Sequence, residues 1–384
     1  MPERVYLDWN ATTPLRPEAR QAMAAAWDVA GNPSSVHAEG RQARRLVEDA
    51  RAAVAAAVGA RLQDVVFTSG GTEANALALT PGVRRGAGEP LRRLLVSAIE
   101  HPSVLSGGRF SAQAIETIRV TGSGLIDLDD LRRLLAAGPP ALVSVMLANN
   151  ETGVLQPVSE AADIVHEAGG LLHVDAIQGL GKIPFDIKGT KADLVSLSAH
   201  KIGGPKGVGA LVLTEEALGL EPLLRGGGQE MGRRAGTENV AGISAFGAAV
   251  RAAVAHLEDN AARLLGLRDR LEAGLKQTPN MVVFSEGVPR LPNTTLFTVP
   301  GLKAETAVIG FDLAGISVSS GSACSSGKVQ PSHVLAAMDL DRELAQGAVR
   351  LSLGWSTSEA GIDLALQAWR KLADVLLKGR RNTA

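Results

Sequence analysis

The chain has 384 residues, with 39 Lys or Arg and 40 Asp or Glu, so its formal net charge is −1. This balance gives no electrostatic case for binding nucleic acid or an anionic membrane surface. A single cysteine can form neither an intramolecular disulfide nor a cysteine-built metal site. The N-terminus shows no signal-peptide pattern, and no apolar run approaches the roughly 20 residues that span a bilayer. We therefore expect a cytoplasmic protein with no metal and no direct membrane or nucleic-acid partner.

Strand and helix patterns alternate through the first two thirds of the chain. Residues 5–7 are strand-like, and residues 41–58 predict an amphipathic helix that ends at Gly59. Apolar, β-branched runs predict strands at residues 64–68, 94–98, 114–120, 141–147, 171–174, 194–197 and 210–213. One helical pattern begins at Thr72, and another covers residues 157–169. This alternation is typical of an α/β protein with a mostly parallel sheet covered on both faces.

The pattern changes beyond about residue 260, which indicates a second unit. One long helical stretch at residues 240–275 closes the larger unit. Beyond it, strands are predicted at 293–299 and 348–353, and helices at 303–314 and 358–378. These elements predict a smaller α+β unit. The strand-like run at residues 5–7 could pair with the sheet of either unit.

Polar residues follow several predicted strands, at the edge where ligands bind in parallel α/β sheets. The run Ser69–Glu73 has two glycines before a helix and could bind a phosphate, although an ordinary turn capped by Thr72 fits as well. His101 comes before a proline and belongs to a loop, either solvated or in a site. Asn149 and Asn150 directly follow the apolar strand predicted at residues 141–147. Their side-chain amides need hydrogen-bond partners, which a ligand or a turn could supply.

Asp175 and Lys201 carry the strongest chemical signals of the larger unit. A carboxylate after an apolar strand is costly unless it meets a cation, such as the pyridinium of pyridoxal phosphate, or caps a helix. Lys201 follows another apolar strand and precedes Gly and Pro, which places it in a pocket or on a surface loop. In a pocket, desolvation lowers a lysine pKa and prepares a nucleophile or Schiff-base former. The neighbouring Ser198 and His200 could hold a phosphate.

The only cysteine, Cys324, lies among small polar residues from Ser319 to Gly327. A free cysteine is more often a buried apolar residue, but these neighbours disfavour burial. An exposed thiol on a loop suits a nucleophile that travels between two places.

Taken together, the motifs resemble one family along the whole chain. These motifs are the run at residues 6–14, Gly31–Ser35, Ser69–Glu73, Glu100–His101, Asn149–Gly153, His173–Ala176, Ser198–Gly207, Arg234–Thr237 and Ser319–Cys324. They are similar to the pyridoxal-phosphate-dependent cysteine desulfurases of the NifS/IscS group, within the class V aminotransferases. The resemblance implies the aspartate-aminotransferase-like fold, with a large cofactor domain at residues 15–258. Residues 1–14 and 259–384 would form the small α+β domain, with a mobile Cys loop at about 319–330.

The resemblance also implies roles for the matched residues. Catalysis would fall to Lys201, Cys324 and His101. The cofactor would be bound by Gly71, Thr72, His101, Asn150, Asp175, Gln178, Ser198, His200, Lys201 and Thr237. Lys201 would carry the cofactor, Asp175 would pair with its ring nitrogen, and Thr237 would reach the phosphate of a partner subunit in a homodimer. Arg350 would clamp the substrate carboxylate, assisted by Asn32. Two positions depart from the pattern, because Gly71 stands where alanine is frequent and Gly203 where tyrosine is common.

The implied reaction converts L-cysteine to L-alanine and leaves a persulfide on Cys324. The sulfur would pass to an acceptor such as an iron–sulfur scaffold, for cluster assembly or tRNA thiolation. Cys324 could transiently share a cluster with that scaffold. Three alternatives stay open: a selenocysteine lyase, another class V enzyme that uses pyridoxal phosphate, and a catalytically silent dimeric homologue.

Overall fold

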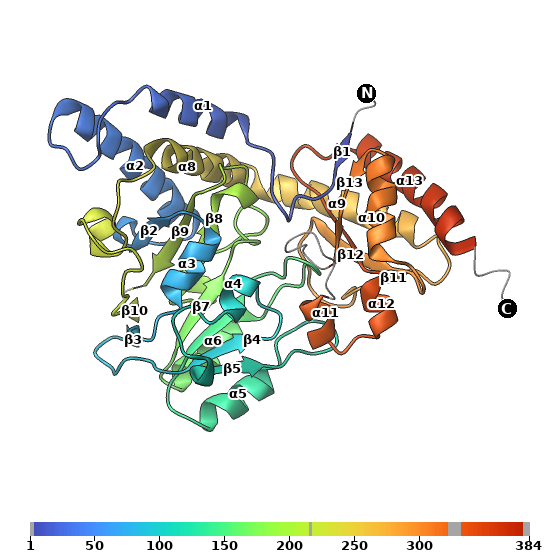
Figure 1. Ribbon diagram of the computed structural model, residues 1–384, viewed down its shortest axis with the longest axis horizontal. Helices are drawn as coiled ribbons and strands as arrows, with labels where there is room; N and C mark the ends of the chain where they lie inside the picture. The colour runs from blue at the N-terminus through green and yellow to red at the C-terminus, as the bar shows by residue number, and fades with distance from the viewer. Residues whose placement is uncertain (1–3, 215–216, 322–331, 379–384) are drawn as a thin grey trace.

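The computed structural model describes residues 4–214, 217–321 and 332–378 (Figure 1). The larger unit, from blue to yellow, lies beside the smaller orange and red unit, and the blue strand β1 (Val5–Tyr6) lies with the latter. Cys324 and most of the predicted Cys loop fall outside the described residues. The domain limits at residues 14/15 and 258/259 stay a prediction.

Seven strands form the central sheet within the described ranges, in the order β2-β9-β8-β7-β6-β4-β5. Their bounds are β2 (Val65–Thr68), β4 (Leu94–Ser97), β5 (Ile115–Ile118), β6 (Leu142–Met146), β7 (Leu171–Asp175), β8 (Leu194–Ser198) and β9 (Gly209–Leu213). The pairings from β8 to β5 are parallel, and β9 is antiparallel to both of its neighbours. The prediction of a mostly parallel α/β sheet is therefore confirmed, and each predicted strand of this unit is present.

Helices cover both faces of this sheet, and the central strands are therefore buried on both sides. One face packs against α1 (Pro17–Trp27), α2 (Ala38–Ala57), α5 (Leu128–Ala136), α6 (Val158–Glu167), α7 (Ile187–Thr190) and α8 (Val240–Ala255). The other face packs against α3 (Gly71–Ala78) and α4 (Pro102–Leu105). A short ribbon of β3 (Arg84–Arg85) and β10 (Ala217–Leu218) lies at the edge of this unit.

The smaller unit has its own sheet and core. Its antiparallel sheet has the order β11 (Val282–Val283), β12 (Thr294–Thr298), β15 (Val349–Ser352) and β14 (Ser319–Ser320). Around it lie α9 (Leu257–Leu275), α10 (Ala304–Leu313), α11 (His333–Ala337), α12 (Arg342–Gln346) and α13 (Glu359–Lys378). Strand β1 pairs in parallel with β13 (Ile316–Ser317), so the N-terminal strand joins the smaller unit.

The helical stretch expected at residues 240–275 is two helices, which is a difference from the prediction. It breaks at His256, and α8 and α9 meet at a bend of 70°. The physical reason is that α8 is buried against the large sheet, whereas α9 packs in the core of the smaller unit. Within the described residues no single helix is long and apolar enough to cross a membrane; α8 and α9 meet that test only as a bent pair.

Candidate active site

The carboxyl ends of β2, β4, β6, β7 and β8 meet at one edge of the large sheet and open into a cavity of about 470 Å³. Most of the residues singled out from the sequence line it: Gly71, Thr72, His101, Asn150, Asp175, Gln178, Ser198, His200, Lys201 and Arg350. Arg350 comes from β15 of the smaller unit, so the cavity lies between the two units. Ser319, at the start of β14, also lines it.

Lys201 lies in the turn that follows β8, and its amine is held by the N-terminal segment. Its Nζ donates to the backbone carbonyls of Asn10 (2.7 Å) and Ala11 (2.8 Å). Burial, and then the positive charge of Arg350, lower the pKa of Lys201 to about 8, against the opposing effect of nearby carboxylates. A substantial share of this amine is therefore neutral near physiological pH.

Asp175 is buried at the end of β7, and each of its carboxylate oxygens accepts one hydrogen bond and can accept another. Oδ2 accepts from Asn75 Nδ2 (2.9 Å), and Oδ1 accepts from the Ile177 amide (3.0 Å). Burial raises the pKa of Asp175 despite these bonds and the neighbouring His101 and Lys201. A cationic ligand group beside this carboxylate would offset the cost of its buried charge.

His101 caps the N-terminus of α4 and faces the same cavity. Its Nδ1 accepts from the Ser103 amide (3.1 Å) and lies 2.7 Å from the Ser103 hydroxyl. Desolvation lowers the pKa of His101, with Asp175 opposing that shift. The ring is therefore mainly neutral at physiological pH.

A candidate anion cradle occupies another wall of the cavity. The N-terminus of α3 presents Gly71 and Thr72, and the end of β8 presents Ser198. His200 Nδ1 lies 3.1 Å from the hydroxyl of Thr12, and burial with nearby lysines lowers the pKa of His200 to about 4. Free helix N–H groups and hydroxyls are the donors that bind a phosphate.

Arg350 has a buried guanidinium with donors still available. Nη2 contacts Asp8 Oδ1 (2.6 Å), and Nη1 donates to the backbone oxygen of Asn150 (2.9 Å). Nε is buried and has no hydrogen-bond partner among the described residues. Such a fork suits a ligand carboxylate, which would compete with Asp8.

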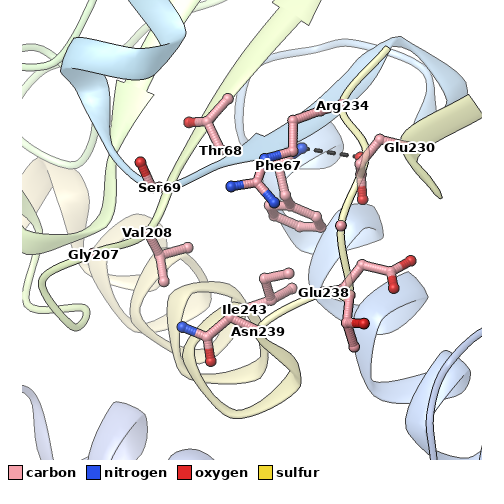
Figure 2. Close-up of a pocket in the computed structure, with 12 residues that line it drawn as sticks. Phe67, Thr68, Ser69, Gly207, Val208, Glu230, Arg234, Glu238, Asn239 and Ile243 are labelled. Atoms are coloured by element: carbon pink, nitrogen blue, oxygen red, sulfur yellow. Dashed lines mark hydrogen bonds between the residues drawn. The ribbon is translucent and has the colours of Figure 1, made fainter. Parts of the chain in front are cut away.

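Two expected site residues do not reach this cavity. Asn32 lies exposed in the turn between α1 and α2, where its Oδ1 accepts from the Ser34 amide. Thr237 lines a second cavity of about 200 Å³, around which Figure 2 shows Glu230, Arg234 and Glu238. The loop that carries Thr237 is tied to its own chain, because Arg234 Nε donates to Glu73 (3.0 Å). Within one chain, neither Asn32 nor Thr237 can touch a ligand in the first cavity.

Sequence reasoning missed several residues that organise the site. The backbone oxygen of Asn10 accepts a hydrogen bond from Lys201, and its side-chain Oδ1 accepts one from the buried Lys182 (2.9 Å). Asp8 pairs with Arg350, and Asn75 binds Asp175. Asp8 and Asn10 stand inside the N-terminal motif at residues 6–14, so that motif was an available signal. Lys182 follows Gln178 by four residues in a glycine-containing loop, which is a weak signal.

Ser319, which precedes the undescribed stretch with Cys324, lines the cavity. Ser319 pairs with Arg350 across β14 and β15. After the undescribed stretch, the hydroxyl of Ser332 donates to Glu151 (2.5 Å), next to Asn150.

Comparisons with known proteins agree on one family. The family model of the class-V aminotransferases matches residues 5–365. A cysteine desulfurase of Cereibacter sphaeroides is 45% identical over 382 residues, covering 97% of each chain. The cysteine desulfurase IscS of Dictyoglomus turgidum is 39% identical, covering 98% of this chain and 96% of its own. The solved structure of a NifS-like protein from Rickettsia africae has a TM-score of 0.88 at 37% identity, covering 97% of this chain and 100% of that one.

Proposed function

The chain belongs to the class-V aminotransferase family, and on that premise we propose that it is a cysteine desulfurase that depends on pyridoxal phosphate. The observation that carries the proposal is the amine of Lys201, which has a pKa of about 8 and shares one cavity with Asp175 and Arg350. A lysine with a lowered pKa captures an aldehyde readily because more of it is the neutral amine. The relatives named cysteine desulfurase support L-cysteine as the substrate.

The residues of the cavity fit pyridoxal phosphate. The buried carboxylate of Asp175 would hold the ring N–H, and the N-terminus of α3 with Ser198 would hold the phosphate. Gln178 and Asn150 would face the ring oxygen, and His101 the ring itself. When bound, pyridoxal phosphate supplies an electron sink for the bond that breaks at the α-carbon of the substrate.

The remaining tasks fall to side chains of this protein. Arg350 would bind the carboxylate of cysteine through its free Nε and the nitrogen that now contacts Asp8. Lys201 Nζ would hold the proton taken from the α-carbon, because its lowered pKa makes it both a base and an acid near neutral pH. His101 would serve as a second proton carrier.

Cys324 would remove the sulfur. Its thiolate would attack the sulfur of the bound cysteine, so that an S–S bond forms and the C–S bond breaks. The bonding electron pair stays with the three-carbon fragment, which leaves as alanine after protonation. Because the chain has no second cysteine, the persulfide must be passed to another molecule.

The assembly and the setting of the enzyme are part of the same proposal. The chain acts as a homodimer in which Thr237 serves the partner's site, since Thr237 lines a second cavity and not that of its own chain's Lys201. The sulfur acceptor is an iron–sulfur scaffold protein or a tRNA-thiolation protein, which the relative named IscS supports. The enzyme works in the cytoplasm without a direct membrane or nucleic-acid partner.

The test is to supply the purified protein with pyridoxal phosphate, L-cysteine and dithiothreitol, and to measure alanine and sulfide. We expect equal amounts of both products from the unaltered protein and from Lys188→Ala, which removes an exposed lysine of α7. Lys201→Ala should form neither product, and Cys324→Ser should release no sulfide. Sulfide at the unaltered rate from Cys324→Ser would disprove the persulfide step.

Two further results of this test would favour the alternatives. Fast turnover of selenocysteine that survives Cys324→Ser, with little turnover of cysteine, would indicate a selenocysteine lyase. A protein that binds no pyridoxal phosphate and forms no product would be the silent homologue.

A further inference from the structure

Lys182 is a buried lysine that the proposed reaction does not use. It lies in the loop after β7, is 9% exposed, and no carboxylate lies within ion-pair distance of it among the described residues. Its Nζ donates to two neutral amide oxygens, Oδ1 of Asn10 (2.9 Å) and Oε1 of Gln178. Burial, together with the charges of Lys201 and Arg350, lowers the pKa of Lys182 well below its ordinary value. A buried amine without a counter-ion is costly, so its position calls for a reason.

The contacts of Gln178 supply that reason. Its side-chain amide has one acceptor, Oε1, and two donors on Nε2. Lys182 occupies Oε1, and the backbone oxygen of Asn10 accepts one Nε2 hydrogen at 2.9 Å. One N–H then remains for the cavity that Gln178 lines.

The opposite orientation of this amide is excluded by the same two neighbours. If the amide were turned over, its NH₂ group would face the amine of Lys182, and its oxygen would face the carbonyl oxygen of Asn10. With Lys182 protonated, so that its Nζ carries donors only, both pairings are repulsive. With Lys182 removed, one of these two constraints disappears.

We infer that Lys182 is a positioning residue that fixes the amide of Gln178 so that an N–H, and not a C=O, faces the ring oxygen of pyridoxal phosphate. The inference rests on the proposed function, since that oxygen belongs to the cofactor. A negatively charged ring oxygen needs a donor, and an amide that could turn over would present an acceptor part of the time. Asn10 joins the same arrangement, because its backbone oxygen also accepts from Lys201 (2.7 Å).

The test is a double-mutant cycle with Lys182→Met and Gln178→Met. Methionine nearly matches the length and volume of lysine and suits a buried position. Lys188→Met makes the same change at an exposed site of α7 and serves as the control. For each apoprotein, the dissociation constant of pyridoxal phosphate is measured without cysteine, and then the visible absorbance band of the bound cofactor is titrated against pH.

If Lys182 acts through Gln178, Lys182→Met should weaken cofactor binding about tenfold, the worth of one hydrogen bond to a charged group. The band should titrate at higher pH, because a proton shared with the ring oxygen is held more tightly once the N–H donor is lost. The double variant should match Gln178→Met alone in both measurements. Lys188→Met should match the unaltered protein.

Additive losses in the double variant, or unchanged binding in Lys182→Met, would overturn the inference while leaving the proposed function standing. Failure of the unaltered protein to form a visible band would overturn both. Circular dichroism of each apoprotein checks folding. Should Lys182→Met not fold, Lys182→Gln removes the amine but keeps a polar side chain, and the same lack of additivity is expected of it.

Discussion

The amine of Lys201 and the guanidinium of Arg350 are coupled by charge across the active-site cavity. Arg350 lowers the pKa of Lys201, whereas Asp8 and Asp175 raise it. Arg350 itself is paired with Asp8. A substrate carboxylate that binds Arg350 would thus change the charge felt by the amine that begins the reaction. Substrate binding and proton transfer are linked at the scale of single residues.

The first prediction concerns Arg350→Met. Loss of the guanidinium removes a positive charge and frees the carboxylate of Asp8, and both changes raise the pKa of Lys201 above about 8. Only the neutral amine captures the cofactor, so the variant apoprotein should capture pyridoxal phosphate more slowly at about pH 7.5. The midpoint of the capture rate plotted against pH should move up by about one pH unit. The measurement is the rate at which the visible band grows between pH 6 and 10.

Arg342→Met is the control for this prediction, because Arg342 is exposed on α12. Its pH profile should match that of the unaltered protein. An unchanged midpoint in Arg350→Met would show that the charge of Arg350 does not lower the pKa of Lys201.

The single residues of the site were predictable only in part. Asp175 and Lys201 follow apolar strands, and the carboxyl ends of those strands meet at one edge, so their position in the cavity could be read from the pattern. Asn10 and Lys182 could not be found that way. The hydrogen bond between them joins residues 172 apart, and no local pattern encodes such a pairing.

At the scale of elements, the turn after Lys201 is held by packing against both ends of the chain. The Arg16 amide donates to the oxygen of Gly203, and Arg16 Nε donates to the oxygen of Ile202. The Arg16 guanidinium lies 4.0 Å over the ring of Trp355. Gly203 has a φ of +91°, and a Cβ on it would lie 2.4 Å from Arg16 Cγ. A larger side chain at this position would not fit beside Arg16 and Trp355.

The second prediction follows from this turn. Gly203→Ala should destabilise the apoprotein by about 2 kcal/mol, through a strained φ and a collision. Gly207→Ala is the matched control, because Gly207 also has a positive φ (+79°) but nothing within 4 Å of a Cβ. It should cost about 1 kcal/mol, from backbone strain alone. Thermal unfolding midpoints of both variants measure the difference, and equal midpoints would contradict the packing argument.

Long elements were predictable and short ones were not. The seven strands of the large sheet are four or five residues long and rich in apolar or β-branched residues, which a pattern can detect. Strands β13 and β14 have two residues each, which is too short to show the alternation of apolar and polar residues that marks a strand. The break at His256 was missed because helical patterns continue on both sides of it, and only the presence of two separate cores separates α8 from α9.

At the scale of the whole molecule, the N-terminal segment joins the two units at the active site. Strand β1 pairs with β13 of the smaller unit, and Asn10 then reaches Lys201 of the larger one. Asn10 also bonds Thr294 of β12 (2.8 Å), so one buried asparagine contacts both units. The sequence left open which unit would take β1, because a three-residue run fits either sheet.

The third prediction tests whether two copies share each site. We expect each site to combine Lys201 of one chain with Thr237 of the other, since Thr237 lies outside the cavity of its own chain. Thr237→Glu would place a carboxylate against the phosphate and should reduce desulfurase activity at least tenfold by charge repulsion. Lys201→Ala should abolish it. Each variant alone therefore forms a weakly active or inactive homodimer.

Mixing the two variants, with subunits exchanged by brief unfolding and refolding, separates the possible arrangements. In a mixed dimer, the Lys201 of the Thr237→Glu chain meets the Thr237 of the Lys201→Ala chain, so one of the two sites is intact. Half of the dimers in an equal mixture are mixed, so activity should recover to about a quarter of the unaltered level. The alanine formed per minute is the readout, and refolding each variant alone is the control. Activity no greater than the mean of the two variants would mean that Thr237 serves its own chain, because every site in a mixed dimer would then keep one defect. Full activity of Thr237→Glu alone would mean that Thr237 serves no site.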